Sequence, residues 1–205
     1  VERLAAEQSA MPFELTRGPL LRTTLVRISQ EEHELLVTQH HIITDGWSVQ
    51  VFLHELAALY VRIHAGQSPE LPALPADAAD YARWQEAARH SGAWSEDLAW
   101  WQRALAELPR LELPLARTLS HRPSESGQDY CFILPAALVT ELEALGRRES
   151  VTLFVLLFTV WSMLMARYSQ QDDFGIGTIA AARDRPEHRS VIGFVANTLV
   201  LRCDL

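Results

Sequence analysis

The sequence contains little cysteine, no excess of basic charge and no very long uncharged run. Cys131 and Cys203 are the two cysteines in 205 residues; this is typical of a reducing cytoplasm, although one disulfide between them stays open. Lys and Arg number 18 against 26 Asp and Glu, which gives a net charge of −8 at pH 7. That balance argues against nucleic acid and against an anionic membrane surface as partners.

Several sequence signatures are also missing. There is no glycine-rich phosphate loop, no Cys-x-x-Cys and no internal repeat, so we predict neither a tightly bound cofactor nor a metal site. The apolar segment 151–168 falls short of the roughly 20 uncharged residues that a membrane span needs, because it contains Thr and Ser and ends near Arg167. The chain opens in a helix-like pattern without a signal-like start. We therefore expect a cytoplasmic protein with no membrane partner.

The composition, 48% hydrophobic and 21% charged, predicts an ordinary globular protein. Segments 20–28 and 35–41 alternate like strands and are joined by a polar turn, and 47–65 has helical spacing. Further helices are expected at 77–90, 91–108, 135–148 and 151–168, further strands at 129–134 and 173–180, and a charged loop at 181–190.

The most informative stretch lies between the second strand and the first long helix. It reads His40-His41-Ile42-Ile43-Thr44-Asp45-Gly46-Trp47-Ser48. Side chains at the end of a strand, on a loop before a helix, commonly reach a cleft while the scaffold stays rigid. Neighbouring residues of an extended segment point to opposite faces, so one histidine should be structural and the other chemical.

Each residue of this cluster has more than one possible role. A histidine with a pKa near 6.5 is the usual general base at neutral pH. Asp45 can orient an imidazole, pair with an arginine or cap the following helix, and Gly46 can supply a turn that a side chain would hinder. A metal site would need more ligands, and the nearest histidines, His33 and His54, form no recognised spacing with the pair.

The cluster resembles the His-His-x-x-x-Asp-Gly motif of condensation domains of nonribosomal peptide synthetases, in the chloramphenicol-acetyltransferase-like superfamily. Segment 79–85 resembles the family's Tyr-Ala-x-Trp motif, and segment 192–202 resembles its Ile-Gly-x-Phe-x-Asn-Thr-Leu-x-x-Arg motif. Pro12-Phe13 and segment 18–22 also fit. Two departures, Ala196 for a larger residue and Arg83 at a usually apolar place, lie outside the histidine motif.

The resemblance implies an α/β fold of the chloramphenicol-acetyltransferase-like, two-lobed kind. By the same resemblance we expect the fold to be incomplete in this chain, because the family's domain is roughly twice this length. Residues 1–120 would be the remainder of the N-terminal lobe, 121–127 a linker, and 128–205 the first part of the C-terminal lobe. We expect the isolated piece to be inactive or poorly soluble, because cut sheets leave unpaired edges.

The resemblance also assigns site roles. His41 would be the catalytic residue, as a base or as a hydrogen-bonding positioner. His40, Asp45 and Gly46 would support it, with Asp45 pairing with an arginine for which Arg22 is a candidate. Three residues are candidates for the wall of a substrate tunnel: Trp47, Ser48 and Asn197. From its position alone, Ser48 fits the first helical turn better than a nucleophile.

The implied reaction is amide formation between a donor acyl or peptidyl thioester and an acceptor aminoacyl thioester. Both would be held on the 4'-phosphopantetheine arms of upstream and downstream peptidyl carrier proteins, beside an adenylation domain. Three alternatives are an epimerisation domain, a heterocyclising domain and a catalytically silent carrier-protein docking module. Aspartates would replace both histidines in a heterocyclising domain, and Trp47 together with segment 193–198 favours condensation over epimerisation.

Overall fold

The computed structural model describes residues 1–114 and 130–205, and it contains helices and strands in mixed order. The elements are α1 (Glu2–Ala10), β1 (Leu21–Arg27), β2 (His33–Gln39), the short 3-10 helix η1 (His41–Ile43), α2 (Gly46–His64), α3 (Ala78–His90), α4 (Ser95–Ala104), α5 (Ala136–Glu149), α6 (Leu153–Ser169), β3 (Asp173–Ala180), the 3-10 helix η2 (Pro186–His188) and β4 (Asn197–Asp204). Most predicted elements are present within a few residues. The predicted strand at 129–134 is wrong over its described part, because residues 130–134 form no strand.

The chain divides into two compact units, Val1–Glu96 with Ile179–Thr198 and Asp97–Thr178 with Leu199–Leu205. The predicted linker 121–127 lies outside the described residues. The assignment of 1–120 and 128–205 to two lobes stays a prediction.

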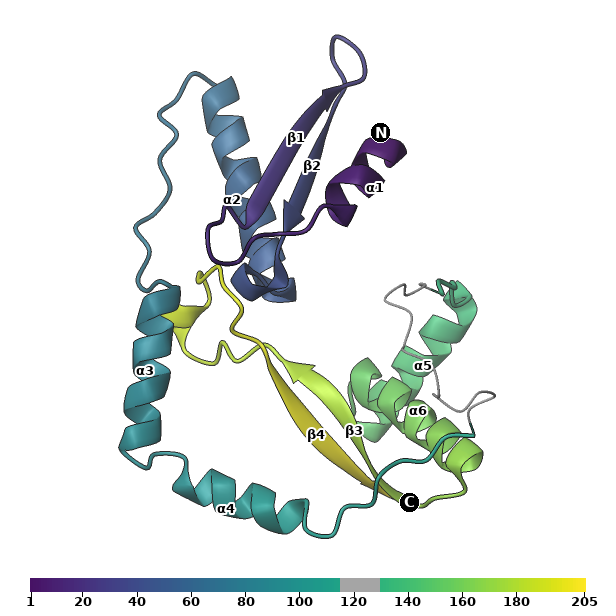
Figure 1. Ribbon diagram of the computed structural model, residues 1–205. Helices are drawn as coiled ribbons and strands as arrows, with labels where there is room; N and C mark the ends of the chain where they lie inside the picture. Colours follow the sequence, from purple (N-terminus) through teal and green to yellow (C-terminus); the bar gives the residue numbers. More distant parts are fainter. Residues whose placement is uncertain (115–129) are drawn as a thin grey trace. The chain divides into compact units, whose positions relative to one another are not determined.

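In the first unit, β1 and β2 form an antiparallel hairpin in which Leu21 faces Gln39 and Arg27 faces His33. Helix α1 lies beside this hairpin (Figure 1). Gln8 of α1 forms hydrogen bonds with both strands of the hairpin. Its side-chain amide donates to Thr38 Oγ1 at 2.7 Å, and its Oε1 accepts from Thr24 Oγ1 at 2.6 Å. The hairpin thus delivers the histidine pair at the end of β2.

Helices α2 and α3 begin where aspartates cap them. Asp45 Oδ1 accepts the Ser48 backbone N–H at 2.8 Å, and Asp77 Oδ1 accepts that of Asp80 at 2.8 Å. Such caps satisfy backbone donors that have no partner within the helix. A small core forms where α3 and the segment after η2 pack together; its buried members are Ala76, Tyr81, Val191 and Val195.

The second unit has its own core, in which α6 packs against β3 and β4. Met165, Phe174 and Cys203 are buried there, and Cys203 Sγ lies 3.3 Å from Ser162 Oγ. Within the described part of the chain, no single helix has the length and hydropathy of a membrane span. Helices α5 and α6 have that length and hydropathy when they are taken as a pair, and the pair is bent by 102°.

Candidate active site

His41 is the first residue of η1, two residues after β2 ends at Gln39, and it is exposed. Its Nδ1 lies 2.6 Å from the backbone oxygen of Thr44. A carbonyl oxygen can only accept a hydrogen bond, so Nδ1 carries the proton in the neutral ring. Nε2 is then the nitrogen with a free lone pair, and it can accept a proton or a hydrogen bond.

His40 faces a different environment from His41, as the alternation of side chains predicts. It caps η1 because its Nδ1 accepts the Ile42 N–H at 3.1 Å. Its ring packs edge-on against Phe13, with 5.9 Å between ring centroids. His40 therefore stabilises the turn that presents His41.

Asp45 is buried, with 2% of its side chain exposed, and it pairs with Arg183, of which 1% is exposed. Arg183 Nη1 donates to Asp45 Oδ2 at 2.9 Å, and Nη2 donates to Oδ1 at 3.1 Å. The backbone N–H groups of Val195 and Ala196 also donate to Oδ2, each at 3.0 Å. Asp45 is thus both helix cap and ion-pair partner, two of the three roles open from the sequence.

Burial alone would raise the pKa of Asp45, but hydrogen bonds from Arg183, Ser48 and Val195 outweigh it and hold that pKa well below its ordinary value. The carboxylate is therefore charged at neutral pH and is no proton acceptor there. Its contacts are with α2 and with the loop that contains Arg183, so it organises the site without performing proton transfer.

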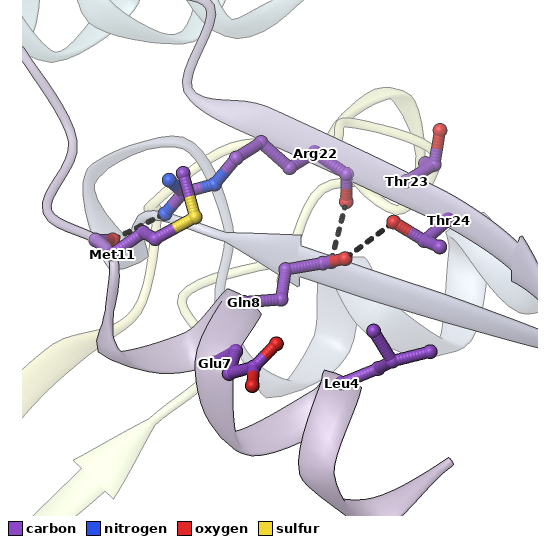
Figure 2. Close-up of a pocket in the computed structure, with 7 residues that line it drawn as sticks. All are labelled: Leu4, Glu7, Gln8, Met11, Arg22, Thr23 and Thr24. Atoms are coloured by element: carbon purple, nitrogen blue, oxygen red, sulfur yellow. Dashed lines mark hydrogen bonds between the residues drawn. The ribbon is translucent and has the colours of Figure 1, made fainter.

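Arg183 was missed by sequence reasoning, which treated 181–190 only as a charged loop. The candidate Arg22 is wrong: Figure 2 shows its side chain directed at the backbone of Met11, to which Nη2 donates. Its guanidinium also lies 3.9 Å from the centre of the Phe13 ring. Arg183 is one of three arginines in its loop and follows no periodic pattern, so no local signal distinguishes it.

Ser48 is fully buried and joins α2 to the segment around Gly193. Its Oγ donates to the Gly193 carbonyl at 2.9 Å and accepts the Gly193 N–H at 3.0 Å. Arg183 Nη2 also donates to Ser48 Oγ, at 2.9 Å. These contacts occupy the hydroxyl, which agrees with a first-turn structural role and not with a nucleophile.

Two other predicted site residues, Trp47 and Asn197, form hydrogen bonds with backbone groups away from His41. Trp47 is 42% exposed, and its Nε1 donates to the Arg189 carbonyl at 2.8 Å. Asn197 is exposed at the start of β4, where its Oδ1 accepts the Thr198 N–H at 2.9 Å. A tunnel role for Trp47, Ser48 or Asn197 stays a prediction.

Gly46 does not supply a special turn, so that sequence interpretation is wrong. It is the first residue of α2, and a Cβ built on it would meet nothing within 4 Å. The local backbone therefore does not require glycine. The lack of a side chain at Gly46 leaves open space beside the histidine loop.

No three His, Cys, Asp or Glu side chains come together as metal ligands in residues 1–114 and 130–205. His33 and His54, the nearest candidates by sequence, do not join the pair in such a group. Within these ranges the histidine cluster is not part of a metal-binding group.

A family model described as "Condensation domain" matches residues 1–205. The chain belongs to the Condensation domain family. Among its relatives is a linear gramicidin synthase protein of Brevibacillus parabrevis, to which it is 39% identical over 206 residues, covering 100% of this chain and 3% of that protein. It is 38% identical to phosphinothricin tripeptide synthetase PhsC of Streptomyces viridochromogenes, covering 98% of this chain and 18% of that protein.

Solved structures resemble this condensation-domain chain along its whole length. The X-domain from teicoplanin biosynthesis superposes with a TM-score of 0.84 at 30% identity, over 100% of this chain and 47% of that one. The chain thus spans about half of that solved structure and a small part of the synthetases. The α/β fold of the chloramphenicol-acetyltransferase-like kind is confirmed.

Proposed function

We propose that this chain is the histidine-bearing part of a domain that forms amide bonds in nonribosomal peptide synthesis. The observation that carries the proposal is the geometry of His41, whose Nδ1 lies 2.6 Å from the Thr44 carbonyl. This bond leaves Nε2 as an exposed acceptor at the end of a strand. An acceptor of this kind suits an amine that must lose a proton as it attacks.

The reaction joins two thioesters held by partner proteins. The acceptor amine attacks the donor carbonyl, a C–N bond forms, the C–S bond breaks, and the donor carrier leaves with its thiol. The proton lost by the amine goes to the departing thiolate. His41 Nε2 either carries that proton or holds the amine in line by a hydrogen bond, and both roles require a fixed acceptor.

The proposed partners are upstream and downstream peptidyl carrier proteins, with an adenylation domain nearby in the same protein. Relatives named as gramicidin and phosphinothricin tripeptide synthetases support this setting. The 4'-phosphopantetheine arms belong to the carriers, so the chain's own residues need only admit them. The open space at Gly46 supports such access, because a Cβ there would meet nothing within 4 Å.

A catalytically silent docking module is the second candidate. It is favoured by one observation: a complex of the X-domain and OxyB from teicoplanin biosynthesis superposes with a TM-score of 0.82 at 30% identity. A chain of this fold can therefore bind another protein. The restrained His41 and the buried pair between Asp45 and Arg183 support the catalytic reading, because a docking surface requires neither.

The test uses the full-length protein with donor-loaded and acceptor-loaded carrier proteins, and it follows the intact mass of each carrier. We expect the acceptor carrier to gain the donor mass, and His41→Ala to slow this gain by at least about 100-fold, the lower range for a general base. His54→Ala, which removes a histidine of α2 away from the turn, is the matched control.

Two other outcomes identify the alternatives. Without transfer, solvent deuterium at the donor α-carbon would indicate an epimerase. Carrier binding with neither reaction would leave the docking module. Transfer that is equally fast in His41→Ala would contradict the role proposed for His41.

A further inference from the structure

Phe194 contacts His41, but the proposed reaction gives Phe194 no role. Its ring lies edge to face with the His41 imidazole, with centroids 5.1 Å apart and an interplanar angle of 81°. In the sequence, Phe194 stands out only by its place in segment 192–202, which resembles the family motif. The contact joins residues that are far apart in the sequence.

The backbone on both sides of Phe194 is anchored. Gly193 is held through both its N–H and its carbonyl by Ser48 Oγ, at 3.0 and 2.9 Å. Val195 and Ala196 donate to Asp45 Oδ2, each at 3.0 Å. Residues held in this way leave Phe194 little freedom to move away from His41.

Core packing does not account for this phenylalanine. Phe194 is 55% exposed, whereas Val191 and Val195 on either side of it are buried in the core of the first unit. A large apolar side chain that remains half exposed on an anchored loop gains little from burial. Its aromatic contact with the His41 imidazole is a specific interaction that burial does not explain.

We propose that Phe194 is a positioning residue for His41. The inference rests on the proposed function. The Thr44 carbonyl fixes which nitrogen carries the proton, but one hydrogen bond leaves the plane of the imidazole free to rock. The Phe194 ring blocks that motion and takes one side of the imidazole out of water, so that Nε2 keeps one direction toward the reacting amine.

The test compares three variants of the full-length protein in single-turnover transfer between loaded carriers. Phe194→Ala removes the ring, Phe194→Leu keeps apolar volume without an aromatic contact, and Phe194→Tyr keeps the ring. We expect Ala and Leu to slow the transfer roughly 3- to 10-fold with little change in carrier affinity, the range that an aromatic pair supplies. Tyr should restore the wild-type rate.

The split between rate and carrier affinity separates positioning from simple structural support. Loss of the ring should lower the maximal rate of transfer in Ala and Leu while the carrier concentration at half-maximal rate stays unchanged, and Tyr should restore the rate. Tyr60→Leu is the matched control, because Tyr60 is an exposed aromatic residue stacked on His64 with centroids 6.2 Å apart. It should leave both the maximal rate and the carrier concentration at half-maximal rate unchanged.

The two ways of failing are distinguishable. A wild-type protein without transfer, or a His41→Ala variant that is fully active, would overturn the proposed function itself. Transfer that depends on His41 while Phe194→Leu behaves like wild type, or while Phe194→Ala weakens carrier binding as much as it slows transfer, would overturn only the role of Phe194.

Discussion

Two arginine–aspartate pairs of similar geometry lie in the two units of this chain. In the first unit, Arg183 and Asp45 have side chains 1% and 2% exposed. In the second, Arg202 and Asp173 are 31% and 27% exposed, with Arg202 Nε 2.8 Å from Asp173 Oδ1 and Nη2 2.6 Å from Oδ2. Both arginines use two nitrogens on two carboxylate oxygens, so the pairs differ chiefly in their surroundings.

The buried pair is part of a larger set of bonds. Asp45 accepts three backbone N–H groups besides the guanidinium, from Ser48, Val195 and Ala196. Asp173 is bonded to Arg202, which also holds the carbonyls of Ala104 and Ala106 at 3.0 Å. Water can replace a lost partner at the exposed pair but not at the buried one. Removal of the aspartate should therefore lower the free energy of unfolding more for the buried pair than for the exposed pair.

The largest expected effect is that of Asp45→Ala. It leaves the Arg183 charge buried without its carboxylate counter-ion, and we expect a loss of about 3–5 kcal/mol in the free energy of unfolding. Urea unfolding followed by tryptophan fluorescence measures it. Asp173→Ala is the matched control and should shift the urea midpoint far less. Equal shifts would show that burial does not distinguish the two pairs.

Ser48→Ala should have the next largest effect. It removes the hydroxyl that bonds Arg183 and both backbone groups of Gly193, and buried polar groups without a partner cost about 1–3 kcal/mol. The same unfolding experiment measures it. Ser95→Ala, on the surface at the start of α4, is the control. A loss no greater than that of the control would mean that the Gly193 segment does not depend on Ser48.

A smaller effect per pH unit is expected from the titration of Asp45. Its pKa in the folded protein lies well below the ordinary value, so the unfolded chain takes up the proton first as the pH falls. The stabilisation is complete above the unfolded pKa of about 3.9 and is lost as the pH falls from there toward the lower pKa of the folded protein, by at most roughly 1.4 kcal/mol per pH unit.

Unfolding free energies at pH 6 and pH 3 measure this dependence, and Asp45→Asn should reduce it. Other acids with lowered pKa values, Asp173 among them, remain in both proteins and cancel in the comparison. An identical pH dependence in Asp45→Asn would contradict the lowered pKa.

The smallest effect should follow from Asp173→Asn, which keeps the shape of the side chain and removes its charge. Because the pair is partly exposed, salt and water already weaken the attraction. The unfolding midpoint should stay close to that of the parent and should be less sensitive to salt. A shift as large as that of Asp45→Asn would show that exposure is not the deciding difference.

Local patterns in the sequence determined much of this protein. The hairpin before His41, the cap at Asp77 and the strand Asp173–Ala180 follow from alternation, helical spacing and the capping preference of aspartate, which act between residues near in sequence. The histidine motif, read by resemblance, also indicated the family that the whole-chain match confirms.

Only the tertiary structure decided which distant residues complete the site. Arg183 meets Asp45 across 138 positions, and Phe194 meets His41 from the same loop region, where neither residue follows a period. The structure also showed that Gly46 is helical and that Arg22 donates a hydrogen bond to the Met11 carbonyl. Such contacts depend on how separated segments pack, and packing is set by the burial of many side chains at once, which local sequence patterns do not encode.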